Sequence, residues 1–292
     1  MGVAAAVLGW ARAIPGVGRL LGGRGKSAGA EPAGSAEDLE AVRGVYPTAI
    51  GLETYMRAVE STLNSKGFNP DNCIALVGIC RDEACRPFQT RIEESFGLSF
   101  SQCSLGGFVT MGQVGFGAAM GHCPLDPKDG RERFVFFGFP HVGVSHNHDV
   151  GKIDRTGRPS SGACGALLGA MGQIQEAEDV AELARAPATV EEPEFSSLVS
   201  KLASQMVKEN VKSEDLNVKS ITDLSETVIT DELEFHIAKA VEGRDCDYAV
   251  FTGTQINSSY VEDIQCRENQ YVAPGKSYCV VKGQRWDMSL DA

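Results

Sequence analysis

The sequence predicts an α/β fold, with a single compact domain in which a central mixed sheet is flanked by helices. Two largely apolar runs of strand length, 73–79 and 133–139, indicate strands that are buried on both faces. Segments with helical periodicity lie between and after these runs, and strand-like runs return near the C-terminus. Such an order of strands, helices and strands is typical of an α/β domain.

The N-terminal half predicts alternating helices and strands. Residues 37–66 place apolar side chains at helical spacing, with a break at Tyr46-Pro47, and Gly67 ends the pattern. A second helical pattern stops at Gly97. In chain order we expect a broken helix over 37–66, a strand over 73–79, a helix over 83–96, a strand over 100–110, a Gly/Ala-rich helix over 112–120 and a strand over 133–139.

The C-terminal half predicts a long helical region followed by strands. Residues 174–242 have a mostly helical pattern, with breaks at Pro187, Pro193 and Asn217. Aromatic and β-branched residues then predict a strand over 246–256. Two further short strands are expected, over 271–272 and 278–281.

The composition is that of a globular domain, and it argues against a nucleic-acid partner and against a membrane span. Of the 292 residues, 42% are hydrophobic and 23% are charged. The net charge is −12 and the pI is near 4.9, so we expect no nucleic-acid partner. Residues 105–123 are uncharged over the length of a membrane span. Their many glycines, together with Gln113 and His122, predict a packed strand and helix instead of a span.

The cysteines do not indicate a disulfide scaffold. There are nine, an odd number, widely spaced in a chain that is large enough to build its own core. Most are therefore expected to be buried small hydrophobic residues. Only Cys80 and Cys164 are distinguished by their neighbours.

The N-terminal segment differs from the rest of the chain. Residues 1–30 contain four basic residues and no acidic residue, and residues 27–37 have the composition of a linker. Basic, acid-poor leaders are typical of organelle transit peptides, although serine is scarce here. A secretory signal and an extension without a targeting role are the alternatives. We expect a transit peptide and linker over 1–36 and the folded domain over 37–292.

Three short motifs each offer one ligand for a borderline metal ion, in the order Cys80, His141, Cys164. Cys80 and His141 each follow a predicted buried strand, at the strand end where ligands usually bind in open α/β sheets. Cys164 precedes an apolar helical run, and a helix N-terminus favours a thiolate. Two thiolates and one imidazole leave the fourth corner of a zinc tetrahedron open, as in catalytic zinc sites.

Asp82 lies two residues after Cys80 and is the candidate to orient the zinc-bound hydroxide by accepting its proton in a hydrogen bond. An adjacent arginine would keep this carboxylate ionised, and Arg81 and Arg86 are the candidates. The alternative is that Asp82 only caps the helix that begins near Glu83.

The remaining histidines are not expected to be metal ligands. His146 and His148 lie in a polar stretch that is expected to be a loop, where they are solvated or relay protons near the pocket. His122 follows the Gly-rich helix and is a candidate to line the pocket. His236 lies in a polar helix and is expected to be exposed.

Four stretches share a pattern with a known family: Cys80-Arg81-Asp82-Glu83, Pro140-His141-Val142-Gly143, Gly151-Lys152-Ile153 and Ala163-Cys164-Gly165-Ala166-Leu167. They resemble the limiting-CO2-inducible protein B family of algae. That family is the theta class of carbonic anhydrases, which is related in site design to the beta class. The resemblance extends over about residues 40–285.

The resemblance implies reversible hydration of CO2 by a zinc-bound hydroxide, in the acquisition of inorganic carbon. Cys80, His141 and Cys164 would hold the zinc, in a site like that of the beta class, and Asp82 would pair with Arg81. The beta class instead places its arginine two residues past the aspartate, where Ala84 stands here. The family further implies a homodimer, or an assembly with a paralogue, and location in the chloroplast, with the mitochondrion or cytoplasm as alternatives.

Three functional hypotheses follow. The first is a zinc lyase that hydrates CO2. The second is a zinc-stabilised member of the same family that is catalytically inactive and binds a partner. The third is a metal-independent cysteine enzyme or redox protein, which would need a Cys-His-Asn arrangement or a Cys-x-x-Cys motif, and the sequence contains no Cys-x-x-Cys.

Overall fold

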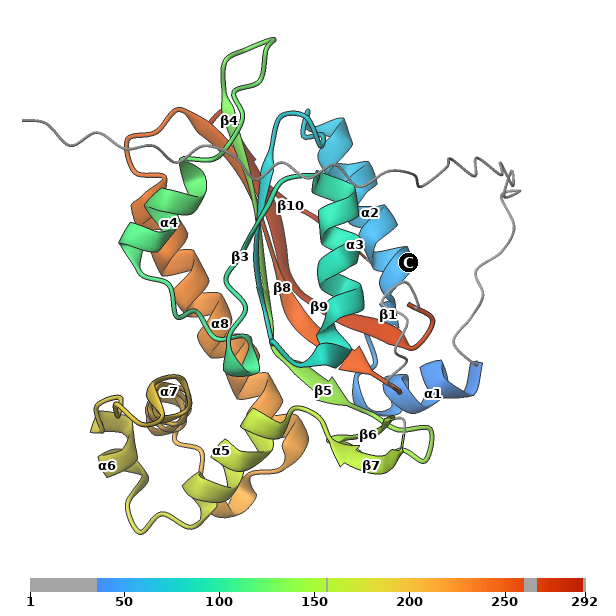
Figure 1. The fold of residues 1–292 in the computed structure, drawn as a ribbon, viewed down its shortest axis with the longest axis vertical. Helices are drawn as coiled ribbons and strands as arrows, with labels where there is room; N and C mark the ends of the chain where they lie inside the picture. The colour runs from blue at the N-terminus through green and yellow to red at the C-terminus, as the bar shows by residue number, and fades with distance from the viewer. Residues whose placement is uncertain (1–35, 156, 260–266, 291–292) are drawn as a thin grey trace, which may run out of the picture. The chain divides into compact units, whose positions relative to one another are not determined.

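A mixed β-sheet forms the centre of the computed structural model, which describes residues 36–155, 157–259 and 267–290. Among these residues, eight strands belong to the sheet (Figure 1). The main path runs β1 (Ile50–Gly51), β9 (Gln270–Val281), β8 (Cys246–Asn257), β4 (Glu132–Phe139), β2 (Ile74–Ile79) and β3 (Ser99–Ser101). The strand β5 (His141–Gly143) also pairs with β8, and β10 (Gln284–Asp287) pairs with β9.

Strand direction separates the sheet into two parts. β3, β2, β4 and β8 are mutually parallel, and β5 continues this part alongside β8. β9 runs antiparallel to β8, and both β1 and β10 run antiparallel to β9. Because β2 and β4 are parallel and in register, their carboxyl ends lie at one edge, where ligand sites form in such sheets.

Helices cover both faces of the sheet. On one face lie α2 (Leu52–Ser65) and α3 (Arg86–Phe96), and on the other lie α4 (Gln113–Met120) and α8 (Val218–Ala240) (Figure 1). Side chains alternate along β4, so that Phe137 packs in the hydrophobic core that includes α2 and α3, and Phe136 packs in the core that includes α4. A strand buried on both faces has few polar positions, which is why the sequence shows largely apolar runs at β2 and β4, with Arg133 as the buried exception in β4.

The remaining elements surround the carboxyl edge of the parallel strands or precede the sheet. They are α1 (Ala36–Val45), η1 (Glu83–Cys85), η2 (Leu105–Gly107), β6 (Lys152–Arg155), β7 (Arg158–Gly162), α5 (Gly165–Gln175), α6 (Val180–Arg185), α7 (Pro193–Glu209) and η3 (Ser213–Asp215). β6 and β7 form a separate two-stranded hairpin. The predicted α/β fold with a central mixed sheet and flanking helices is therefore confirmed.

Two predicted elements differ from the structure. The strand expected over 100–110 is only the three-residue β3, because the chain then turns through Gly106 and Gly107 at positive φ. A Cβ on Gly107 would lie 2.3 Å from the carbonyl oxygen of Phe139, so only glycine allows this approach to β4. The two short C-terminal strands are one continuous strand, β9, which a sequence containing Pro274 and Gly275 did not indicate.

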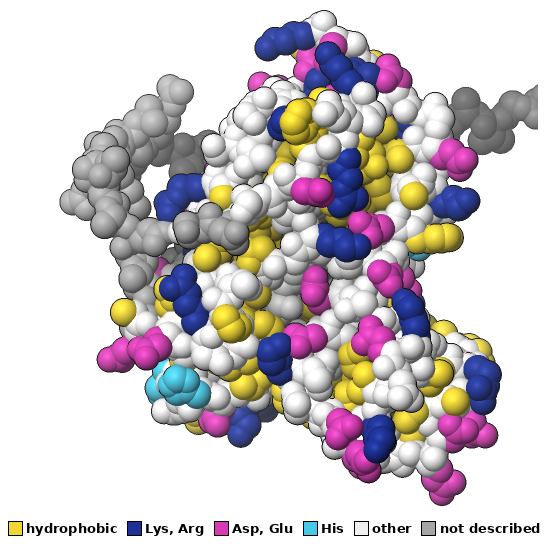
Figure 2. All heavy atoms as spheres, turned by 180° about the vertical axis from the view of Figure 1, so that it is seen from behind, with side chains coloured by type: hydrophobic (Ala, Val, Ile, Leu, Met, Phe, Trp, Pro, Cys, Tyr) yellow, Lys and Arg dark blue, Asp and Glu magenta, His cyan; other side chains and the backbone are white. Residues whose placement is uncertain are grey.

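The predicted transit peptide and linker, except for Ala36, lie outside the described residues. No helix in the described part of the chain is long and apolar enough to cross a membrane. On the face seen in Figure 2, basic and acidic side chains are interspersed.

Candidate metal centre

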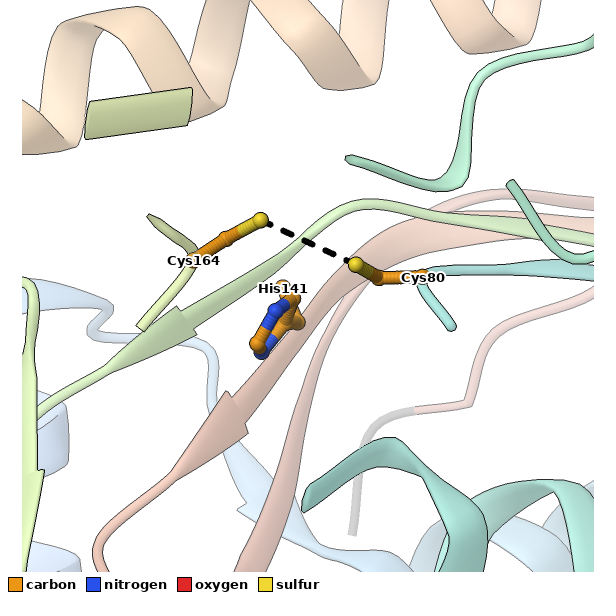
Figure 3. A group of neighbouring side chains, drawn as sticks. All are labelled: Cys80, His141 and Cys164. Atoms are coloured by element: carbon orange, nitrogen blue, oxygen red, sulfur yellow. Dashed lines mark hydrogen bonds between the residues drawn. The ribbon is translucent and has the colours of Figure 1, made fainter. Parts of the chain in front are cut away.

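Cys80, His141 and Cys164 converge at the carboxyl edge of the parallel strands (Figure 3). Cys80 directly follows β2, His141 opens β5 just after β4, and Cys164 is the N-cap residue of α5. Their ligand atoms all lie within 4.8 Å of one another, and all three residues are buried. The structure thus brings together the three residues that the sequence singled out.

The donor set fits a tetrahedral zinc ion. The two Sγ atoms of Cys80 and Cys164 are 3.7 Å apart. Two sulfur ligands at the usual Zn–S distance on a tetrahedral ion would be about 3.8 Å apart. Nε2 of His141 is buried and has no hydrogen-bond partner, as expected of an atom that serves as a metal ligand. Two thiolates and an imidazole are also the donor types that zinc prefers.

The neighbours of Cys80 favour its ionised form. A hydrogen bond from Cys164, and a second from Cys85, hold the pKa of the Cys80 thiol well below its usual value against the effect of burial. The same hydrogen bond, together with burial, raises the pKa of Cys164. Burial lowers the pKa of His141, but the Cys80 thiolate, the charge of Asp82 and the hydrogen bond with Asn257 together outweigh it and raise the value to about 9. One thiolate is thus already favoured where a cation would bind.

Asp82 lies at the same edge, in the turn that follows β2. Its Oδ2 is 3.7 Å from Nε2 of His141. The carboxylate also accepts a hydrogen bond from the Ala84 amide at 3.0 Å, so the capping role considered from the sequence is present as well. Asp82 is therefore both a cap of the turn and a neighbour of the metal ligands.

The arginine that binds Asp82 is Arg155, and the expected pair with Arg81 is wrong. Nη2 of Arg155 donates to both carboxylate oxygens of Asp82, at 3.0 and 3.1 Å. Arg81 turns away and binds Glu194 at 2.6 Å, and Arg86 is exposed at the start of α3. The chain bends at Asp82, so Arg81 and Arg86 point elsewhere, and the hairpin strand β6 supplies the guanidinium.

Comparisons with known proteins assign the chain to a family. The family of limiting CO2-inducible proteins B/C beta carbonic anhydrases matches residues 49–281. This chain belongs to that family. The crystal structure of the limiting CO2-inducible protein LCIB is 32% identical, covers 88% of this chain and 99% of its own, and superposes with a TM-score of 0.71.

A second solved structure supports the fold of this family member. PtLCIB4, a homologue of LCIB, is 21% identical, covers 86% of this chain and 99% of its own, and has a TM-score of 0.68. No curated protein sequence matches the chain. The family assignment therefore rests on the match over residues 49–281 and on LCIB itself.

The other histidines of this limiting-CO2-inducible family member lie outside the Cys-His-Cys group. His122 is exposed beside Phe100, with ring centroids 6.0 Å apart. His146 is 3.9 Å from a carboxylate oxygen of Asp154, and His148 lies in the same turn. His236, expected to be exposed, is half-buried and stacks on Phe116.

Sequence reasoning missed Arg155 and Asn257. Oδ1 of Asn257, the last residue of β8, lies 3.0 Å from Nδ1 of His141. The only signals in the sequence are an arginine two residues beyond the Gly151-Lys152-Ile153 stretch and a polar residue at a predicted strand end. Neither signal is specific without the tertiary structure.

Proposed function

We propose that this protein catalyses the zinc-dependent, reversible hydration of CO2 to bicarbonate. The convergence of Cys80, His141 and Cys164 in a member of a carbonic anhydrase family carries the proposal. A zinc ion in such a site would lower the pKa of a water molecule and make a nucleophile available near neutral pH. The three protein ligands would leave one position of the tetrahedron free for this chemistry.

Asp82 and Arg155 would orient the attacking water. An ionised carboxylate only accepts hydrogen bonds, so Asp82 would fix the direction of one O–H bond and turn an oxygen lone pair toward CO2. The two hydrogen bonds from Arg155, at 3.0 and 3.1 Å, hold the carboxylate in one orientation. Arg155 is itself fixed by Glu83 at 2.6 Å and by Ser161 at 2.7 Å. These contacts support a positioning role for Arg155 rather than for Arg81.

A cysteine nucleophile is the second candidate, because Cys80, His141 and Asn257 form a Cys-His-Asn arrangement. Two observations favour the metal. A second thiol, Cys164, lies 3.7 Å from Cys80, and only 4% of the Cys80 surface is exposed. A nucleophilic cysteine needs access to its substrate, and a second cysteine has no part in such a triad.

Metal content by mass spectrometry and stopped-flow CO2 hydration on the same preparation test the proposal. We expect about one zinc per chain and hydration that is lost on chelation. Hydration that survives complete metal removal would overturn it. Alkylation of the chelated protein, with a thioester or amide assay, would then test the cysteine nucleophile.

The variant Asp82→Ala separates catalysis from capping. If Asp82 orients the water, zinc is retained and hydration falls roughly ten- to hundredfold, as for other residues that support metal ligands. If it only caps the turn, stability falls by about 1 kcal/mol and activity per folded molecule is unchanged. Zinc content, melting temperature and hydration rate on this one variant distinguish the two.

We further propose that the protein forms a homodimer, with a hetero-oligomer with a paralogue as the alternative, and that it acts in inorganic-carbon acquisition in the chloroplast. The exposed side of α4 carries the apolar Val114 and the small residues Gly117 and Ala118, which would let a second chain approach closely. Light scattering at micromolar concentration tests the assembly, and a monomer mass would contradict it. Import of the full chain fused to a fluorescent protein tests the location.

A further inference from the structure

Three buried amide side chains form a hydrogen-bonded chain next to Nδ1 of His141. Gln255, Asn257 and Gln270 are 1%, 0% and 2% exposed. Asn257 and Gln270 face each other across the antiparallel β8–β9 pair. Buried amides are costly unless their hydrogen bonds are satisfied, so a cluster of three beside a candidate metal ligand calls for a role.

One backbone carbonyl fixes the direction of every hydrogen bond among these three amide side chains. The carbonyl oxygen of Ala84 lies 3.1 Å from Nδ2 of Asn257 and 3.2 Å from Nε2 of Gln270. A carbonyl oxygen can only accept, so both side-chain NH2 groups must face it. Nδ2 of Asn257 also donates to Oε1 of Gln270 at 2.8 Å, which agrees with this orientation.

The orientation of Asn257 leaves only its Oδ1 to face His141. Oδ1 lies 3.0 Å from Nδ1 of the ring and can only accept, so Nδ1 must carry the proton. In a neutral imidazole the lone pair then belongs to Nε2, the atom that has no protein partner. We propose that Asn257, oriented by Gln270 and the Ala84 carbonyl, is a positioning residue that fixes the tautomer and ring angle of His141 for metal binding.

The same hydrogen-bond chain reaches the turn that carries Asp82. The Ala84 carbonyl accepts from the two amides, and the Ala84 amide donates to Oδ1 of Asp82 at 3.0 Å. Hydrogen bonds thus connect both His141, through Asn257, and Asp82 to the backbone of Ala84, although His141 and Asp82 follow different strands. This inference rests on the proposed metal-dependent function, since it assigns a role toward the metal that His141 would hold.

A buried asparagine elsewhere provides a matched control. Asn72 is 1% exposed and donates to the Gly67 carbonyl at 2.9 Å and to Asp126. It precedes β2, so it lies at the opposite strand end from Cys80. Loss of Asn72 should therefore destabilise the fold as loss of Asn257 does, without touching His141.

The test measures zinc affinity by competition with a chromophoric chelator for the full chain and for N257L, N257D, Q270L and N72L. We expect N257L to weaken zinc binding about ten- to hundredfold and Q270L to weaken it less. N257D keeps an acceptor for Nδ1 and should retain more affinity than N257L. N72L should bind zinc as the parent does.

Two spectroscopic readouts report the ring directly. In 15N-labelled zinc protein, the Nδ1–H resonance of His141 should be seen in the parent and shifted or broadened by solvent exchange in N257L. The visible bands of the cobalt-substituted protein should shift in N257L and not in N72L. Parent-like zinc affinity in N257L, or an equal loss in N72L, would overturn the proposal.

The affinity measurement does not depend on turnover. A parent protein that binds zinc but does not hydrate CO2 would contradict the proposed activity, while the effect of N257L on zinc affinity would still test the role of Asn257. N257L protein that remains folded with unchanged affinity would contradict the role of Asn257 alone.

Discussion

The two ends of the parallel strands bury polar groups in opposite ways. At the amino end, Asp247 is 0% exposed and accepts two hydrogen bonds from Arg131, at 3.0 and 2.8 Å. Arg133 lies beside the same carboxylate, with its Nε 3.6 Å from Oδ2. At the carboxyl end, Cys80, His141 and Cys164 face one another, and the nearest carboxylate oxygen, Oδ2 of Asp82, lies 3.7 Å from Nε2 of His141.

The difference separates a buried polar cluster that stabilises the fold from one that is suited to bind a ligand. Opposite charges at the amino end compensate each other, so that cluster needs nothing from outside the chain. The carboxyl end gathers two sulfurs and one unpartnered ring nitrogen, a set that only a soft or borderline cation satisfies. We expect the first cluster to govern stability and the second to govern metal binding.

The largest expected effect on stability is at the amino end. Asp247→Ala removes the only carboxylate that bridges Arg131 and Arg133 among the described residues, and leaves the buried Arg133 and the partly buried Arg131 less compensated. We expect a loss of about 3 to 5 kcal/mol in the free energy of unfolding, with zinc per folded chain unchanged. Urea unfolding and metal analysis measure the two. Loss of zinc from folded variant protein would show that the two ends are not independent.

At the carboxyl end, Cys164→Ser should remove most of the zinc. A hydroxyl is a poor ligand for a borderline-soft ion, so we expect the affinity to fall by more than the roughly hundredfold limit for supporting residues. Cys123→Ser is the matched control, because Cys123 lies at the amino end, where its thiol contacts the Arg133 carbonyl at 3.2 Å. If Cys164→Ser keeps full zinc affinity, the ligand set is wrong.

A finer comparison within the carboxyl end sets Arg155 against Arg81. Arg155→Gln should lower CO2 hydration roughly tenfold to hundredfold with zinc retained, because Asp82 loses the two hydrogen bonds that orient it. Arg81→Gln breaks a contact with Glu194 on the protein surface and should leave hydration nearly unchanged. Equal losses in both variants, measured by stopped flow, would contradict the assignment of Arg155.

The smallest effect concerns Glu226, a partly buried residue in neither cluster. Burial and the nearby Asp223 raise its pKa, and its hydrogen-bond partner Thr252 is 3.5 Å away. The folded state thus holds the proton more tightly, and stability is lost as pH rises above the ordinary carboxyl pKa.

Glu226→Gln cannot ionise, so it should raise the melting temperature more at pH 8 than at pH 4. The gain should lie within the roughly 0.5–2 kcal/mol range of single stabilising substitutions. Thermal unfolding at the two pH values measures it. A larger gain at pH 4 would contradict the sign of the pKa shift.

The sequence by itself determined the fold class and the three candidate ligands. Buried strands reveal themselves as unbroken apolar runs, and the residue after such a run lies at the sheet edge where ligands gather. Cys80 and His141 could be located in this way, and Cys164 by the apolar helix that follows it. These are local patterns, set within a few residues.

Only the tertiary structure decided which side chains support the ligands. Arg155 reaches Asp82 from a hairpin 73 residues along the chain, and Asn257 reaches His141 from a strand 116 residues away. Their positions depend on the register of β8 against β5 and β9 and on the placement of the β6–β7 hairpin. No periodicity encodes such pairings, because a hydrogen bond between distant residues is fixed by packing and register, not by local sequence.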